Sequence, residues 1–224
     1  TGWVEPGRWL ADYTTPVGEI RTVHLADGSM AVMDSHTALS VRYTASERRI
    51  VLIGGEAYFT VAPVTVDERR PFVVESAGGT STALGTEFMV AREGTGVDTT
   101  VTEHSVRVAT RDVGTLHRSV IVEEGQSVHY GRDGTLGTPV SVPAASMTAW
   151  RNGQLVFDNA TLSDVIGRLN HYRRGRIMLM SSGLGARRVS GVFSCTDTDG
   201  AVMAITRQLA LRSVSVGGLA TVIY

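Results

Sequence analysis

The step from Gly85 to Thr86 is the place in this sequence where residue types alone could break a bond. A threonine hydroxyl can attack the carbonyl carbon before it, which moves the acyl group from nitrogen to oxygen and leaves an ester that water cleaves. A glycine before the threonine permits the tightly turned backbone that this attack needs. A structural interpretation stays open beside it: Leu84-Gly85-Thr86 enters a strand, and the glycine relieves crowding.

Metal and cofactor chemistry lack a recognisable pattern. The histidines are scattered, with no HExxH and no Cys/His cluster at ligand spacing: His24, His36, His104, His117, His129 and His171. Asp197-x-Asp199-Gly200 resembles part of a calcium loop, but the downstream glutamate is missing, and helix capping explains these aspartates better. We expect Cys195 to be a buried small apolar residue. We therefore expect no metal, no cofactor and no enzymatic activity apart from self-cleavage at Gly85-Thr86.

Composition excludes several functions. The chain has 224 residues with a formal net charge of −1, so no overall field favours nucleic acid or an anionic membrane as partner. All 21 basic residues are arginine, which excludes a Walker-type lysine and a Schiff-base lysine. One cysteine cannot form an internal disulfide. No apolar run approaches the length of about 18 residues that crosses a bilayer, and we expect the chain to be a fragment whose anchor lies before Thr1.

The first part of the chain, up to about residue 145, is predicted to be all β, a sandwich or a solenoid-like stack. Residues 20–25 and 30–33 flank Asp27-Gly28, a two-residue hairpin signal. Two further strands are predicted at 49–53 and 56–61, broken by Gly54-Gly55. The remaining predicted strands are 72–74, 87–90, 105–108, 119–122 and 127–130.

The second part, residues 146–224, is predicted to be a small α/β domain of two βαβ-like units. A helix capped by Asn159 or Thr161 carries apolar residues at helical spacing, namely Leu162, Val165, Ile166 and Leu169. A second helix is predicted to start at Asp197 or Asp199. The predicted strands are 155–157, 176–180, 189–193, 213–216 and 220–223.

A series of short motifs, in order, resembles the periplasmic region of the FecR family from about Ala11 to the last residue. The matching segments are Gly18-Glu19-Ile20, Val23-His24-Leu25-Ala26-Asp27-Gly28-Ser29, Gly55-Glu56-Ala57-Tyr58-Phe59, Arg70-Pro71-Phe72-Val73-Val74, Ala83-Leu84-Gly85-Thr86-Glu87-Phe88, Glu124-Gly125-Gln126, Trp150-Arg151-Asn152-Gly153-Gln154-Leu155-Val156-Phe157 and Ser190-Gly191-Val192-Phe193. The resemblance implies an all-β FecR-type domain over residues 1–145. It implies a short secretin/TonB N-terminal-like (STN-like) signalling domain over residues 146–224.

The same resemblance implies a role in cell-surface signalling for iron and siderophore uptake. FecR-like proteins are inner-membrane anti-sigma regulators whose periplasmic region binds the signalling domain of a TonB-dependent outer-membrane transducer. Through a cytosolic segment absent here, they control an extracytoplasmic-function (ECF) sigma factor, and periplasmic and intramembrane proteases act on them. Some members cut themselves at a Gly-Thr step like Gly85-Thr86. The implied location is the periplasmic face of the inner membrane in a Gram-negative bacterium.

A relay of this kind needs an exposed strand edge or apolar face for its partner. We expect the transducer to dock on residues 150–224, at two segments where arginines flank apolar strand positions. The candidate contact residues are Arg176, Ile177, Leu179, Arg187, Arg188 and Val189. Solvated arginines beside core strands are the alternative. A second functional hypothesis is a periplasmic β-rich module that itself binds a siderophore or glycan.

Overall fold

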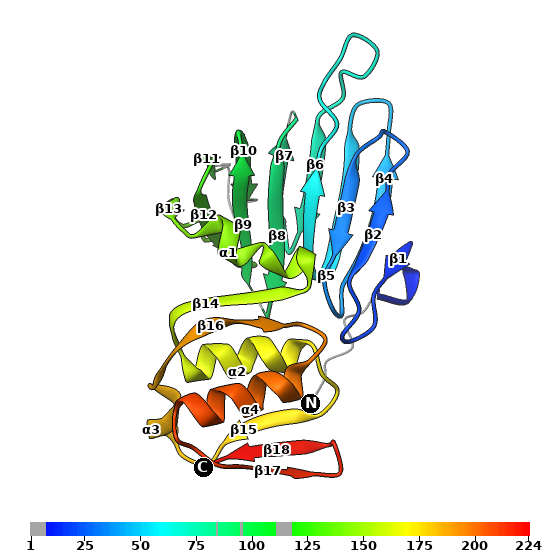
Figure 1. Ribbon diagram of the computed structural model, residues 1–224. Coiled ribbons are helices and arrows are strands. Elements are labelled where there is room, and N and C mark those ends of the chain that lie inside the picture. Colours follow the sequence, from blue (N-terminus) through cyan, green and yellow to red (C-terminus); the bar gives the residue numbers. More distant parts are fainter. Residues whose placement is uncertain (1–7, 84, 95, 111–117) are drawn as a thin grey trace. The chain divides into compact units, whose positions relative to one another are not determined.

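The computed structural model describes residues 8–83, 85–94, 96–110 and 118–224. The chain divides into two compact units, which we call unit 1 (residues 1–15 and 20–148) and unit 2 (residues 16–19 and 149–224). Each is described by itself. Strands predominate over helices along the chain (Figure 1), which confirms the prediction of a mainly β protein.

Unit 1 is a 13-stranded sheet that curls around one apolar core. Its main path runs β11-β10-β7-β6-β5-β8-β9-β12-β13, and β1 to β4 extend it from β5. The strands are β1 (Tyr13–Thr14), β2 (Arg21–His24), β3 (Met30–Met33), β4 (Ala38–Tyr43), β5 (Arg48–Thr60), β6 (Phe72–Ser76), β7 (Gly79–Ala83), β8 (Glu87–Glu93), β9 (Gly96–Glu103), β10 (Ser105–Thr110), β11 (Arg118–Glu123), β12 (Gln126–Gly131) and β13 (Val140–Ser141). A 3-10 turn, η1 (Arg8–Leu10), and a short helix, α1 (Ala144–Met147), flank the sheet in sequence. The sequence predicted a sandwich or a solenoid-like stack, whereas the structure has one continuous curled sheet.

Strand β5 belongs to both halves of this sheet. Its first part pairs with β4 and β6, and its second part pairs with β3 and β8. Core positions shift by one residue along it, from Ile50 and Leu52 to Ala57 and Phe59. Gly55 between them has a φ of +83°, and the β4 pairing changes register just before it, between Leu52 and Gly54, as at a β-bulge. The prediction of two strands broken at Gly54-Gly55 was therefore wrong, because these glycines bend one strand rather than end it.

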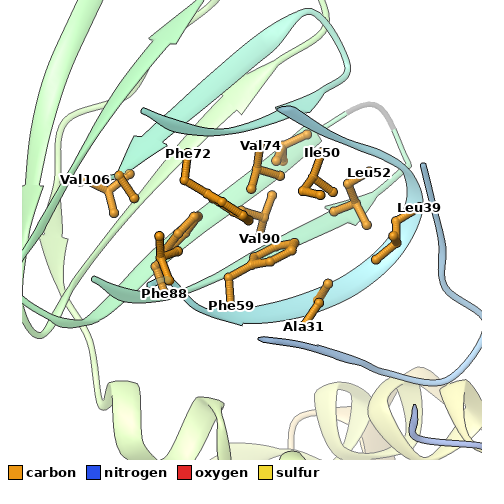
Figure 2. Packing of buried hydrophobic residues seen from close by; sticks show 14 of the residues in the cluster. Ala31, Leu39, Ile50, Leu52, Phe59, Phe72, Val74, Phe88, Val90 and Val106 are labelled. Atoms are coloured by element: carbon orange, nitrogen blue, oxygen red, sulfur yellow. The ribbon is translucent and has the colours of Figure 1, made fainter. Parts of the chain in front are cut away.

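The core of unit 1 is centred on phenylalanines from neighbouring strands (Figure 2). The Phe59 ring lies 5.7 Å from the Phe72 ring and 5.5 Å from the Phe88 ring, centroid to centroid. Tilted rings at this separation attract each other beyond the gain from burial alone. Because these strands pair across β5, the cluster fixes both halves of the sheet against a common centre.

The predicted hairpin at Asp27-Gly28 forms, with β2 and β3 antiparallel. Its loop has three residues instead of two, since the Leu25 N–H donates to the Ser29 carbonyl over 2.8 Å. Gly28 takes the positive φ, +84°, that this longer turn requires. Asp27 is the middle residue of this loop.

Unit 2 holds two helices between a two-stranded and a three-stranded sheet (Figure 1). Its elements are η2 (Ala149–Asn152), β14 (Gln154–Thr161), α2 (Leu162–His171), β15 (Arg176–Leu179), α3 (Ser182–Gly185), β16 (Arg188–Ser194), α4 (Thr198–Gln208), β17 (Ser213–Val216) and β18 (Ala220–Ile223). The predicted strands and helices occur in the predicted order, and the short helix α3 between β15 and β16 was not predicted. The strands of each predicted βαβ unit do not pair, however, because β14 pairs with β16 and the other sheet has the order β15-β18-β17. Each helix therefore leads from one sheet to the other.

Both long helices begin where the sequence predicts. The Thr161 hydroxyl accepts a hydrogen bond from the Asp164 N–H over 3.1 Å at the start of α2. The Asp197 carboxylate accepts one from the Gly200 N–H over 2.8 Å at the start of α4. The four predicted apolar residues of α2 are all buried: Leu162, Val165, Ile166 and Leu169.

Candidate functional site

Gly85 and Thr86 lie immediately before β8. Gly85 has a φ of +113°, and a Cβ at this position would lie 3.1 Å from the Cα of Pro63, so only glycine fits without strain. Thr86 is buried, and its hydroxyl has no hydrogen-bond partner among the described residues. Its carbonyl accepts from the Val61 N–H over 3.0 Å, which anchors the segment to the end of β5. Leu84 lies outside the described residues.

The first candidate docking segment is β15, at one edge of the three-stranded sheet. Arg176 is exposed, Ile177 is buried and Leu179 is half-buried. The open side of this strand is covered at its centre by Asn170 of α2. The Asn170 amide oxygen accepts from the Ile177 N–H over 2.7 Å, and its amide nitrogen donates to the Ile177 carbonyl over 3.0 Å. Asn170 thus occupies the main-chain groups that a partner strand would need at Ile177.

The second candidate segment lies at the start of β16, in the two-stranded sheet. Arg187 and Arg188 are exposed, while Val189 is completely buried. The Arg188 guanidinium donates to the Asn159 carbonyl over 2.9 Å. The two segments therefore belong to different sheets, and the side chains of Ile177 and Val189 face the interior.

The formal charge is unevenly distributed, which the whole-chain value of −1 hides. Residues 149–224 contain nine arginines and four aspartates, a net charge of +5, and the remaining residues carry −6. None of the four aspartates lies in the three-stranded sheet. The division is already present in the sequence, when the charges of its two parts are counted separately. A basic unit favours a partner with an acidic surface.

The histidines and carboxylates form no metal centre in the described part of the chain, where no three potential ligands gather; His117 lies outside it. The two aspartates of the calcium-like pattern have structural roles. Asp197 caps α4, as expected, and Asp199 pairs with Arg173 over 3.0 Å. Cys195 is buried, also as expected.

A buried ion pair that the sequence did not suggest joins two loops to β5. The Arg48 guanidinium lies 2.9 Å from the Asp27 carboxylate, and both side chains are fully shielded from solvent. Arg48 also donates to the carbonyls of Arg70, over 3.0 Å, and Ala62, over 3.1 Å. The Tyr43 hydroxyl donates to Asp27 over 2.7 Å. These contacts hold the loop of residues 61–71 against the β2–β3 turn.

The surroundings of this ion pair shift the pKa values of Asp27 and Tyr43. Burial by itself raises the pKa of Asp27, but hydrogen bonds from Ser29, Tyr43 and Arg48 outweigh it and leave the pKa below its usual value. Burial, followed by the hydrogen bond to Asp27, raises the pKa of the Tyr43 phenol well above its usual range. Asp27 is therefore charged and Tyr43 neutral at neutral pH, and the cluster keeps its pairing over the physiological range.

The described chain consists of a curled sheet followed by a basic α/β unit. Residues 11–107 match the family model described as FecR protein, and this part of the chain belongs to that family of signal-transduction regulators. The resemblance stated from the sequence is thereby confirmed. The family is regulatory rather than catalytic.

Two crystal structures, at 1.65 Å and 2.50 Å resolution, of a putative anti-sigma factor from Parabacteroides distasonis share the fold. Each is 22% identical in sequence and covers 95% of this chain and 97% of its own, with TM-scores of 0.76 and 0.75. No curated protein matches the chain. A search of the described helices for one long and apolar enough to span a membrane found none.

Proposed function

We propose that this chain is the periplasmic signal-receiving region of an inner-membrane anti-sigma factor. It binds the signalling domain of a TonB-dependent outer-membrane receptor and relays siderophore occupancy to an ECF sigma factor. The observation that carries the proposal is the FecR match over residues 11–107. The basic surface of residues 149–224 supports a docking role for unit 2, for which we keep the name STN-like domain. Arg176, Arg187 and Arg188, the candidate contacts named from the sequence, are exposed there.

Affinity capture tests the proposal. The chain of residues 1–224 is immobilised and exposed to envelope extract from iron-starved Gram-negative cells, and retained proteins are identified by mass spectrometry. We expect a TonB-dependent receptor to be retained, and to be displaced by its own purified signalling domain. A chain ending after residue 148, checked for folding by circular dichroism, should lose it. If a folded bait retains no receptor from an extract that contains one, the proposal fails, and a thermal-shift screen with siderophores and glycans tests direct ligand binding instead.

We also propose that the chain cuts itself between Gly85 and Thr86. The support is geometric: the Thr86 hydroxyl is buried without a hydrogen-bond partner among the described residues, directly after a glycine of positive φ. In the reaction, Thr86 Oγ attacks the Gly85 carbonyl carbon, the peptide C–N bond breaks, the Thr86 nitrogen takes up a proton, and water hydrolyses the ester. Gel electrophoresis of freshly purified protein should show fragments of residues 1–85 and 86–224.

The threonine variants separate this reaction from external proteolysis. Thr86→Ala removes the nucleophile and should give uncut chain, whereas Thr86→Ser keeps a hydroxyl and should give fragments. Hydroxylamine should speed cleavage if the ester forms. Fragments that persist in Thr86→Ala would assign the cut to a separate protease.

A further inference from the structure

The two outer strands of the three-stranded sheet in unit 2 differ in how their free edges are treated. The order β15-β18-β17 makes β15 and β17 the edges in the described part of the chain. On β15, the N–H groups of Arg176 and Met180 donate to residues beside or within β18, so the main-chain groups of Ile177 point to the free side. Asn170 covers them there with two hydrogen bonds. A strand added to this edge would have to displace Asn170.

The free edge of β17 carries no such cover. Arg212 and Tyr224 exchange two hydrogen bonds of 2.9 Å, so they form a hydrogen-bonded antiparallel pair. Pairs alternate along an antiparallel ladder, and the next pair is Ser213 with Ile223. The main-chain N–H and C=O groups of Ser213 and Ser215 therefore point away from β18, toward the free side. In the described part of the chain, no main-chain hydrogen bond is made on that side.

The sheet face next to this edge is apolar and exposed. Met178 of β15, Val222 of β18 and Val214 of β17 stand directly opposite one another in register. Because side chains alternate along a strand, the residues two positions away share their face. We define the outer sheet face by Met178, Met180, Val214, Val216, Val222 and Tyr224, five of which are 43–70% exposed. The helices cover the opposite face of the sheet (Figure 1), where Ile177 and Ile223 are buried.

Charge decides what kind of occupant suits this edge. Arg212 and Arg176 are exposed on the outer sheet face, and the sheet contains no acidic residue. Edge-to-edge pairing of two copies would bring together two units that each carry an excess of arginine, which is unfavourable. An extended segment of a different protein, with carboxylates near Arg212 and apolar side chains over Val214 and Val216, satisfies both the charge and the apolar face.

We propose that the free edge of β17, between Arg212 and Val216, is the place where an acidic partner strand adds to the sheet of this protein. The inference rests on the proposed function, because it takes the partner to be the receptor's signalling domain. It assigns docking to an edge that neither candidate segment from the sequence includes. Main-chain hydrogen bonds to Ser213 and Ser215 supply the affinity, and the outer sheet face and Arg212 supply the selectivity.

A pair of substitutions at one residue tests the edge. Ser215→Pro removes an N–H that points to solvent and leaves the hydrogen bonds between β17 and β18 in place, so the sheet tolerates it. Ser215→Ala keeps that N–H and is the matched control. The probe is the purified signalling domain of the receptor recovered by affinity capture, and binding is measured by calorimetry. Ser215→Pro should raise Kd by about tenfold or more through loss of a hydrogen bond and collision of its ring with the incoming strand, whereas Ser215→Ala should bind as the unchanged chain does.

Charge reversals distinguish β17 from the other candidate segment. Arg212→Glu should weaken binding and reduce its dependence on salt, whereas Arg187→Glu, beside β16, should do neither. All variants are checked for an unchanged far-ultraviolet circular dichroism spectrum. The β17 assignment would be overturned if a folded Ser215→Pro variant bound as the unchanged chain does, or if only Arg187→Glu lost binding. In either case, binding of the signalling domain by the unchanged chain would still support the proposed function. Failure of the unchanged chain to bind the signalling domain would overturn both.

Discussion

Replacing Arg48 with methionine should be among the most destabilising single substitutions in unit 1. Methionine keeps much of the volume but removes the cation that pairs with Asp27 and the donors to the carbonyls of Arg70 and Ala62. The Asp27 carboxylate would remain shielded from water with Tyr43 and Ser29 as its hydrogen-bond donors. Breaking a buried pair by removing one partner costs about 3–5 kcal/mol, and we expect a loss in that range.

The neighbouring Arg49 is the matched control. It pairs with Glu47 and Glu75 at the surface, with about a quarter of its side chain exposed. Exposed pairs of this kind contribute about 0–1 kcal/mol, so Arg49→Met should have a small effect. Urea unfolding followed by far-ultraviolet circular dichroism gives both values. The double variant Asp27→Asn/Arg48→Met should lose less than the sum of its single variants. Equal losses for Arg48→Met and Arg49→Met would refute the importance we assign to the buried pair.

Three further substitutions, and one matched control, test the fold. Gly55→Ala should lower the free energy of unfolding by about 1–3 kcal/mol because of the positive φ. A further loss should come from the new Cβ, which would lie 2.6 Å from the Cα of Thr37. The control Gly94→Ala, which has a positive φ but open space around it, should lower the free energy of unfolding by less, as measured by urea unfolding. The pKa of Asp27 is lower in the folded chain than its value of 3.8 in the unfolded chain. The charged carboxylate therefore stabilises the fold above about pH 4, and this contribution is lost as pH falls through the folded pKa. Asp27→Asn should make the melting temperature fall less steeply below about pH 4. Asn170→Ala should remove both hydrogen bonds to the Ile177 main chain and lower the free energy of unfolding by about 1–3 kcal/mol in urea unfolding.

Local patterns in the sequence predicted unit 2 well. The helix α2 has its cap and its four buried apolar residues where helical spacing places them, because both depend on residues close in sequence. The pairing of strands was beyond such patterns. Nothing local distinguishes a βαβ unit whose strands pair from one whose helix leads to a second sheet, as α2 does between β14 and β15.

In unit 1 the failures have other physical causes. Strand β7 has the sequence Gly-Thr-Ser-Thr-Ala, which lacks the apolar alternation of a half-buried strand and was not predicted. Gly54-Gly55 resembles a turn, although here it bends β5. The Arg48–Asp27 pair joins residues 21 positions apart, so no spacing rule indicates it. Asn170 bonds to the Ile177 main chain only because the fold brings α2 against β15, so nothing in the sequence singles it out.

The strand order of unit 1 decides what a cut at Gly85-Thr86 would accomplish. Residues before the cut supply β1 to β7, and residues after it supply β8 to β13. In the sheet, β5, β6 and β7 of the first piece lie between β10 of the second piece on one side and β8 on the other. The strands of the two pieces therefore alternate within one sheet, and the fragments of a cut chain should stay associated. They should co-elute in native chromatography and separate only in denaturant.

Such a nicked protein would behave as a non-covalent heterodimer built from one gene product. Its pieces would separate only when the ladders β5–β8 and β7–β10 open, so a pulling force or a processive protease acting on one piece would release the other intact. The cut would then leave the folded structure unchanged at rest. It would matter only when a force or a protease acts on one of the two pieces.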